Sequence, residues 1–128
     1  MLIAIVRSLV GESWRPPAAL FESYPVLRTV RWRKGGLPLV IGGWALGQRS
    51  VAGITLGRTV FLRSPELASP RLLLHEVAHV RQFERDKAFP MRYLWESIRR
   101  GYVRNRFEAE ADQFAEEVLW SSTQRRQS

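Results

Sequence analysis

Two histidines and a glutamate lie within five residues, at a spacing that could support metal chemistry. His75 and His79 are the only histidines in the chain, and they are four residues apart. On a helix, side chains four residues apart project from the same face, so both imidazoles can reach one metal ion. Glu76 would lie about 100° around the helix axis from His75, beside the ion rather than among its ligands. A general base that takes a proton from water on the metal needs this position.

The residues around this motif favour a helix. Residues 72–74 and 80 extend the apolar character on both sides, Ser69 can act as an N-cap, and Pro70 suits the first helical turn. We expect the helix to continue to about Lys87, before the next proline stops it. The alternative interpretation is a core helix with two hydrogen-bonded histidines, which gives Glu76 no role in an apolar run.

A third ligand is required, because a catalytic zinc ion usually has three protein ligands and one position for water. The chain has no cysteine and both histidines are already used, so the third ligand must be a carboxylate. In a helix that starts near residue 106, Glu108 lies at the edge of the inward apolar face, whereas Glu110 points away. Asp112 is one turn after Glu108, on the same side, and could accept a hydrogen bond from a histidine ring N–H. A capping box with Asn105 is the alternative role for Glu108.

Peptide hydrolysis would also need a donor for the oxyanion that develops on the substrate carbonyl. Our candidate is Tyr102, because it lies in the short link just before Glu108. Tyr93, Arg104 and Arg106 are the alternatives.

The two motifs together resemble a known class of enzymes. His-Glu-Val-Ala-His at residues 75–79, followed by Phe-Glu-Ala-Glu-Ala-Asp at residues 107–112, resembles the gluzincin clan of zinc metallopeptidases. In that clan a second helix supplies a glutamate in an E-x-x-A-D or similar setting. The pair is distantly similar to the CAAX prenyl and heat-shock membrane protease family, although this chain lacks that family's transmembrane helices. The resemblance covers about residues 72–117 and implies Zn²⁺ bound by His75, His79 and Glu108, with Glu76 as base.

The order of the predicted elements indicates an α+β fold, with strands and turns in the first half and helices in the second. We expect strands at residues 26–33, 37–41, 51–56 and 59–63, and helices at residues 17–23, 70–87, 91–100 and 106–120. Tight turns at residues 35–36 and 57–58 would make the small sheet mostly antiparallel. The resemblance implies that this arrangement is zincin-like, with the sheet preceding the active-site helix. We expect one domain over residues 1–128, with residues 1–24 packed on it as an N-terminal segment and residues 121–128 frayed.

The charge and hydropathy of the chain bear on its partners. A formal charge of +8, from 20 Lys and Arg against 12 Asp and Glu, favours anionic partners in general. The arginines are spread along the chain, which is typical of a solvated surface rather than a nucleic-acid interface. No run reaches the ~18 apolar residues that span a bilayer, and residues 1–10 do not have the pattern of a signal peptide. We therefore expect a soluble cytoplasmic protein whose partner is a peptide or protein substrate.

Three functions are compatible with these patterns. The first is a zinc metalloendopeptidase, with a peptide lying in extended form along an exposed strand at residues 51–56 or 59–63. The second is a catalytically silent zinc-binding or regulatory module of the same fold. The third is a basic nucleic-acid binder in which the histidine motif is accidental. Glu76 favours the first function over the second, because zinc binding alone does not need it.

Overall fold

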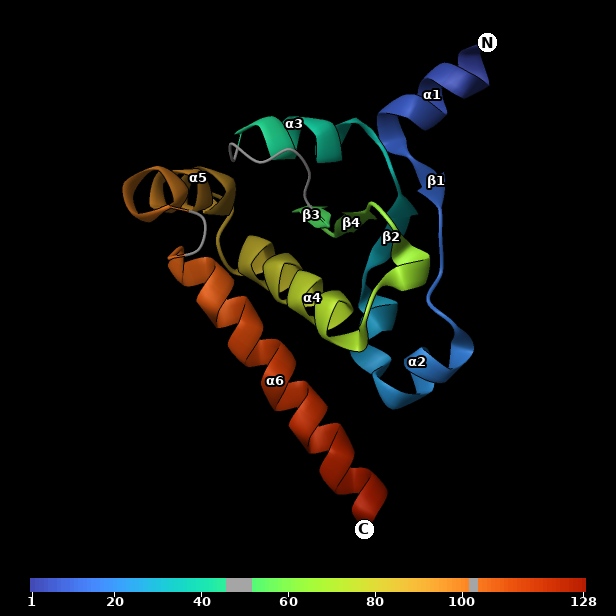
Figure 1. The fold of residues 1–128 in the computed structure, drawn as a ribbon, viewed down its shortest axis with the longest axis vertical. Coiled ribbons are helices and arrows are strands. Elements are labelled where there is room, and N and C mark those ends of the chain that lie inside the picture. Colours follow the sequence, from blue (N-terminus) through green and yellow to red (C-terminus); the bar gives the residue numbers. More distant parts are fainter. Residues whose placement is uncertain (46–51, 102–103) are drawn as a thin grey trace.

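The computed structural model describes residues 1–45, 52–101 and 104–128. In these ranges the chain forms helices, short strands and two 3₁₀ segments (Figure 1). In chain order they are α1 (Leu2–Val10), β1 (Glu12–Ser13), α2 (Ala18–Ser23), η1 (Pro25–Thr29), β2 (Arg31–Lys34), α3 (Leu37–Ala45), β3 (Gly53–Leu56), β4 (Thr59–Leu62), η2 (Pro65–Leu67), α4 (Pro70–Arg85), α5 (Phe89–Arg100) and α6 (Arg106–Gln127). The fold is therefore α+β, as predicted.

The sheet has four short strands in the order β1-β2-β4-β3. The β3–β4 hairpin is antiparallel and turns at Gly57 and Arg58, as the sequence predicts. The pairing of β1 with β2 is also antiparallel, but β2 and β4 run parallel, so the sheet is mixed. In the range 26–33, where we expected one strand, η1 occupies the first part and β2 begins only at Arg31. β3 has a neighbour on one side and forms an edge of the sheet.

The prediction of a strand at residues 37–41 is wrong, because these residues begin α3. A continuous apolar run fits a buried strand and a helix equally well, and Pro38 suits a first helical turn. Parallel strands cannot be joined by a tight turn, so the chain between β2 and β4 must cross over, and α3 is part of that crossover. Gly35 and Gly36 start the change of direction with φ angles of 71° and 109°, which favour glycine.

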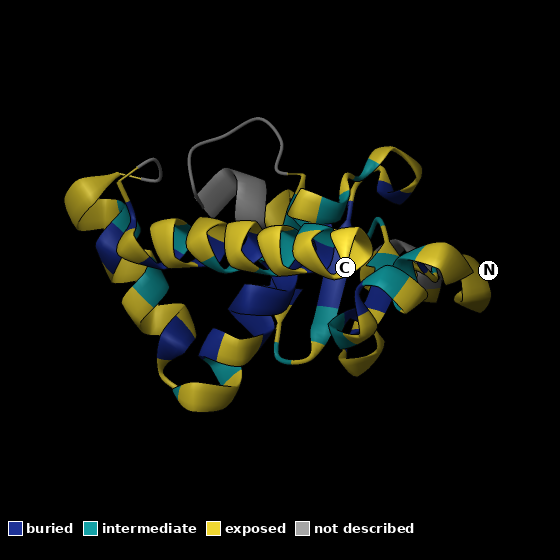
Figure 2. Ribbon diagram, turned by 90° about the horizontal axis from the view of Figure 1, so that it is seen from below, coloured by how far each residue is buried: buried dark blue, intermediate teal, exposed yellow. Residues whose placement is uncertain are grey.

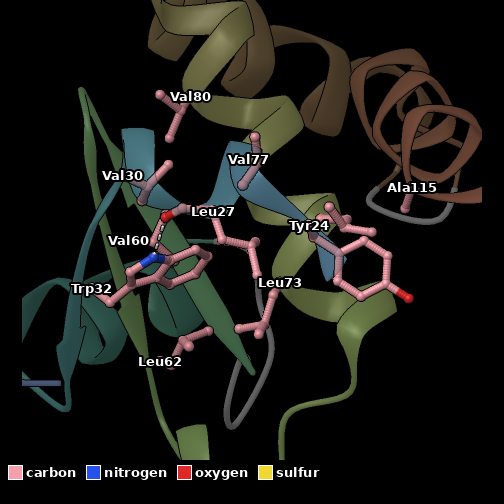
Figure 3. Packing of buried hydrophobic residues seen from close by; sticks show 11 residues of the cluster. Tyr24, Leu27, Val30, Trp32, Val60, Leu62, Leu73, Val77, Val80 and Ala115 are labelled. Atoms are coloured by element: carbon pink, nitrogen blue, oxygen red, sulfur yellow. Dashed lines mark hydrogen bonds between the residues drawn. The ribbon is translucent and has the colours of Figure 1, made fainter. Parts of the chain in front are cut away.

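The main core lies between the sheet and α4 (Figure 3). The inward face of α4 contributes Leu73, Leu74, Val77 and Val80, as the apolar spacing of a helix predicts. Buried residues from the sheet, from the segment before it and from α6 complete this core: Tyr24, Leu27, Val30, Trp32, Val60, Leu62 and Ala115. The indole N–H of Trp32 donates to the Leu27 carbonyl at 2.9 Å, so this buried hydrogen-bond donor has a partner. The packing fixes the rotation of α4, and with it the direction of its histidines.

The last helix, α6, packs against α4 and continues to Gln127. We expected residues 121–128 to fray, but the helix includes Ser121–Gln127 and Ser122 is buried. Figure 2 shows that the outer face of α6 is exposed, with buried residues gathered behind it. The inner face carries the buried residues Phe107, Ala111 and Ala115.

The N-terminal segment divides into two parts. Residues from position 14 onward pack on the core, with Trp14 against Trp32 at a ring-centroid distance of 6.2 Å. In contrast, α1 projects from the molecule beside α3 (Figure 1). Its apolar side chains are exposed. Among residues 1–45, 52–101 and 104–128, no helix combines the length and the apolar composition that crossing a bilayer requires.

Candidate metal centre

Helix α4 presents the two histidines on one face. The helix begins as predicted: Pro70 is in its first turn, and the hydroxyl of Ser69 accepts a hydrogen bond from the Leu72 N–H at 3.1 Å. His75 and His79 lie one turn apart, with their ring centroids 4.8 Å from each other. His79 is buried and His75 is partly buried, so both rings sit in a protected environment.

Helix α6 supplies the carboxylate, as the helical phase of Glu108 predicts. One carboxylate oxygen of Glu108 lies 2.8 Å from His75 Nε2, and the other lies 3.0 Å from His79 Nε2. One ligand atom from each of the three residues falls within 4.8 Å of the others. The three side chains could therefore hold one metal ion. The alternative role of Glu108, in a capping box with Asn105, is therefore wrong, because both of its carboxylate oxygens face the histidines.

The buried Asn105 fixes where α6 begins and hence where Glu108 points. Its side-chain oxygen accepts from the Phe107 N–H at 2.8 Å, which makes it the N-cap. Its amide nitrogen donates to the Tyr93 carbonyl at 3.1 Å and to the Ser97 hydroxyl at 2.9 Å. One side chain thus joins the start of α6 to α5.

Each histidine also has a partner for its second ring nitrogen. His75 Nδ1 lies 2.8 Å from a carboxylate oxygen of Asp112, as predicted. His79 Nδ1 lies 2.7 Å from the side-chain oxygen of Gln82, whose amide nitrogen donates to the Phe107 carbonyl at 3.1 Å. Because a carbonyl only accepts, the amide orientation of Gln82 is fixed and its oxygen faces His79. Both Nδ1 atoms therefore donate, which leaves both Nε2 atoms for the Glu108 side: protonated, they donate to its carboxylate, and deprotonated, they could bind a metal ion.

Sequence reasoning missed Gln82, although a signal for it existed. Gln82 is three residues after His79, and residues three apart on a helix are neighbours on its surface. A polar side chain at this position, beside an apolar helix face, could form a hydrogen bond with the histidine ring. Its complete burial supports that role.

Tyr93 contacts the candidate ligand rather than standing free as an oxyanion donor. Its hydroxyl donates to a Glu108 carboxylate oxygen at 2.6 Å. Its ring packs edge-on against His79, with a centroid distance of 5.8 Å, so it orients both groups. Of the other candidates for the oxyanion donor, Tyr102 lies outside the described residues. Arg106 lies over the Phe107 ring at 4.8 Å from its centroid and pairs with Glu96 at 3.8 Å.

Glu76 is buried next to the donor set, with an exposed fraction of 4%. The Thr55 hydroxyl donates to one of its carboxylate oxygens at 2.9 Å. A β-carbon added to Gly53 would be 3.1 Å from the other oxygen, a tight contact, so glycine at residue 53 eases the close approach of β3 to Glu76. Nothing local in the sequence signals these two contacts, because they join a strand to a helix 20 residues later.

The three-residue donor set opens onto a cleft of about 420 Å³. The cleft is lined by Ala52, Gly53, Ser69, Arg71, Leu72, His75, Glu76, Glu108 and Asp112. It therefore runs from the edge of the sheet, past the carboxylate of Glu76, to the start of α6. Two imidazoles and one carboxylate, each held by a further hydrogen bond, are the donor set that divalent transition metals such as zinc prefer.

The electrostatics of the metal-free site are those of a tight ion-pair cluster. Burial lowers the pKa of His75, but the hydrogen bond to Glu108, the charges of Glu76 and Glu108 and the contact with Asp112 outweigh it and raise this pKa from 6.5 to about 9. The pKa of His79 is raised for similar reasons, against the effect of burial. Burial raises the pKa of Glu108, but hydrogen bonds from both histidines lower it well below 4.5. Without metal, protons on the histidines compensate the carboxylate charge.

These pKa shifts predict that the stability of the metal-free fold and the affinity for metal depend on pH in opposite directions. The histidine contribution to stability is complete below pH 6.5 and is lost as the pH rises toward about 9. The Glu108 contribution is present above pH 4.5 and is lost below it. We expect the free energy of unfolding of chelator-treated protein, measured in urea, to be higher at pH 6 than at pH 9. Metal affinity should rise over the same interval, because binding displaces the histidine protons. An affinity that is flat with pH would contradict this account.

No protein-family model, curated protein or solved structure matches the chain. The gluzincin resemblance therefore stays a prediction carried by the motif residues. What the chain does has to be argued from the geometry of His75, His79 and Glu108 and of the groups around them.

Proposed function

We propose that the chain is a zinc-dependent metallopeptidase of the gluzincin type, with His75, His79 and Glu108 as ligands and Glu76 as general base. The observation that carries this proposal is the buried carboxylate of Glu76, held by β3 beside a three-residue donor set. Burying a second carboxylate, that of Glu76, costs desolvation free energy. A site that only binds metal does not need this carboxylate, whereas a hydrolytic site needs it as a base. Zinc as the metal, a peptide as the substrate and the cytoplasm as the location belong to the same proposal.

The chain's own residues would divide the work of hydrolysis as follows. Bound zinc would polarise the substrate carbonyl and lower the pKa of a water molecule toward ~7. Glu76 would accept a proton from that water and deliver it to the leaving amine. Thr55 engages one carboxylate oxygen of Glu76, which leaves the other oxygen for proton transfer. Tyr93 would hold the Glu108 carboxylate in place, and Tyr102 remains our candidate for the oxyanion donor.

The edge strand β3 is the part of the sheet where an extended peptide would bind. Of the two strands considered from the sequence, β4 lies between β2 and β3, which leaves β3 as the edge. In the β3–β4 ladder, Ala52 accepts from Arg63, so by alternation the backbone groups of Gly53 and Thr55 point away from β4. Gly53 lines the cleft that contains Glu76, and its backbone groups could pair with a peptide backbone.

The test of the proposed function combines metal analysis with a cleavage assay. Purified protein should contain close to one zinc ion per chain, and it should cleave members of a peptide library. Cleavage should stop on chelation and return with added zinc. Bound zinc without cleavage of any peptide would instead favour the silent zinc-binding module. If the purified protein contained no divalent metal and bound DNA in a salt-sensitive way, the hypothesis of a basic nucleic-acid binder would be favoured. The proposed peptidase function would then be wrong.

The contact between Thr55 and Glu76 predicts a selective effect on catalysis. Thr55→Val keeps the side-chain shape but removes the hydroxyl that positions the base. We expect kcat to fall about 10–100-fold, the cost of a slightly misplaced catalytic group, while KM and zinc content stay unchanged. Thr29→Val is the matched control, because it removes a hydroxyl bonded to the Val26 carbonyl away from the metal centre. An equal loss of activity in both variants would contradict a positioning role for Thr55.

A further inference from the structure

Three helices leave apolar side chains in solvent at one end of the molecule. α1, α3 and α5 lie toward the same end of the long axis, opposite the C-terminus of α6 (Figure 1). Their exposed apolar residues are Leu2, Ile3, Ile5, Val6, Leu9 and Val10 on α1, Leu37, Val40 and Ile41 on α3, and Met91, Leu94, Trp95 and Ile98 on α5. Scattered exposed apolar residues are common in proteins, but such a concentration at one end is typical of a binding surface. We call these residues the apolar end.

On helix α5 the exposed apolar side chains all lie on one side of the helix. Its inward side carries the buried residues Phe89 and Glu96, and Tyr93, which reaches the metal centre. Its outward side carries the four exposed apolar residues at positions 91, 94, 95 and 98, spaced as one continuous helical stripe. An apolar stripe of this kind normally faces the core, yet here it faces solvent, with Trp95 60% exposed.

The charges around the apolar end have one predominant sign. Residues 1–10 contain Arg7 and no acidic residue, and residues 35–48 contain no charged residue. α5 carries three arginines, Arg92, Arg99 and Arg100, against one glutamate. The chain as a whole has a formal charge of +8. The partner of this surface should therefore be both apolar and anionic.

We propose that the apolar end docks on the surface of an anionic lipid bilayer. A protein partner would need a contour complementary to three separate helices, one of which projects, whereas a fluid bilayer adapts to convex apolar groups. α1 has 9 residues and α5 has 12, fewer than the ~20 that span a bilayer, so both would lie in the interface. Arginines beside the stripe would contact lipid phosphates while Trp95 and Ile98 enter the acyl boundary. This proposal does not depend on the proposed function.

Vesicle sedimentation with the full chain tests the proposal. We expect the protein to sediment with vesicles of phosphatidylcholine and phosphatidylglycerol in equal parts, much more weakly with phosphatidylcholine alone, and less at high salt. The double variant Ile3→Gln/Ile5→Gln and the single variant Trp95→Gln should each weaken binding, on the order of tenfold for the double variant.

Trp120→Gln is the matched control, because Trp120 is 66% exposed on α6, away from the apolar end. It should leave vesicle binding unchanged, and circular dichroism should show that all variants stay folded. Failure to bind anionic vesicles would overturn the proposal, and so would equal weakening by Trp95→Gln and Trp120→Gln. A dimer that forms without lipid and is lost in Trp95→Gln would also overturn it, because the occupant would then be a second copy.

Discussion

Replacing Glu76 with glutamine is expected to slow peptide cleavage by orders of magnitude while leaving zinc binding intact. The amide keeps the size of the side chain and can still interact with the Thr55 hydroxyl, but it cannot accept a proton at neutral pH. Because general-base catalysis contributes about 10²–10⁴-fold, kcat should fall by a factor in that range. The measurement is cleavage of a peptide identified with the native protein, together with the zinc content of both proteins.

Glu84→Gln is the control for this substitution. Glu84 is on the same helix but is exposed and paired with Arg58 at 2.9 Å, so its loss should not affect cleavage. Equal activity in native protein and Glu76→Gln would remove Glu76 from the mechanism. A loss of zinc in Glu76→Gln would instead indicate that this carboxylate helps to bind the metal.

The second large effect is expected for Glu108→Gln. This carboxylate is shared by His75 and His79, and it is the only acidic group in the donor set found among the described residues. Substitution of groups that only orient metal ligands costs about 10–100-fold in affinity, so the loss of a ligand should exceed 100-fold. Competition with a chromophoric chelator measures this change.

The thermal stability of the same variant gives an independent measurement. Metal that binds only the folded chain stabilises it by ~2.7 kcal/mol at a free concentration of 100 times Kd. At a fixed zinc concentration, native protein should gain this stability and Glu108→Gln should not. Glu110→Gln is the control, because Glu110 is two residues away, exposed and paired with Arg85. An unchanged zinc affinity in Glu108→Gln would show that the third ligand lies elsewhere.

Helical geometry accounts for how much of the candidate site could be predicted from the sequence. The spacing of His75 and His79, the inward phase of Glu108 and the turn between Glu108 and Asp112 all follow from 3.6 residues per turn. The structure brings these four side chains together as the spacing predicts. The starts of α4 and α6 could also be predicted, because Ser69 and Asn105 are favourable N-cap residues.

The contacts that involve other elements could not be predicted in this way. Thr55 and Gly53 reach Glu76 only because β3 crosses near α4, and no local pattern reports which strand lies at the edge of a sheet. Tyr93 was an alternative candidate for the oxyanion donor, whereas in the structure its hydroxyl donates to the Glu108 carboxylate, a contact that joins α5 to α6. Tertiary packing decides such contacts.

The wrong prediction of a strand at residues 37–41 also arose because tertiary packing, rather than the local sequence, decides the structure there. Their apolar run fits either structure, and a turn at Gly35 and Gly36 suggested a hairpin with the preceding strand. The parallel pairing of β2 with β4 excludes that hairpin, and parallel pairing is a property of the whole sheet rather than of any short segment.

The parallel pairing of β2 with β4 also has a consequence for the folding kinetics. The chain between Lys34 and Thr59 has to close as a loop before any rung of that ladder can form, and this entropic cost precedes the gain from burying Trp32, Val60 and Leu62. Until then, the apolar face of α4 that meets the sheet has no sheet to pack against, although α6 can already pack on α4. We therefore expect refolding on the order of milliseconds to seconds rather than microseconds. Sheet closure should therefore be the step that brings β3 to the Glu76 carboxylate, as a late event in the maturation of the newly made chain.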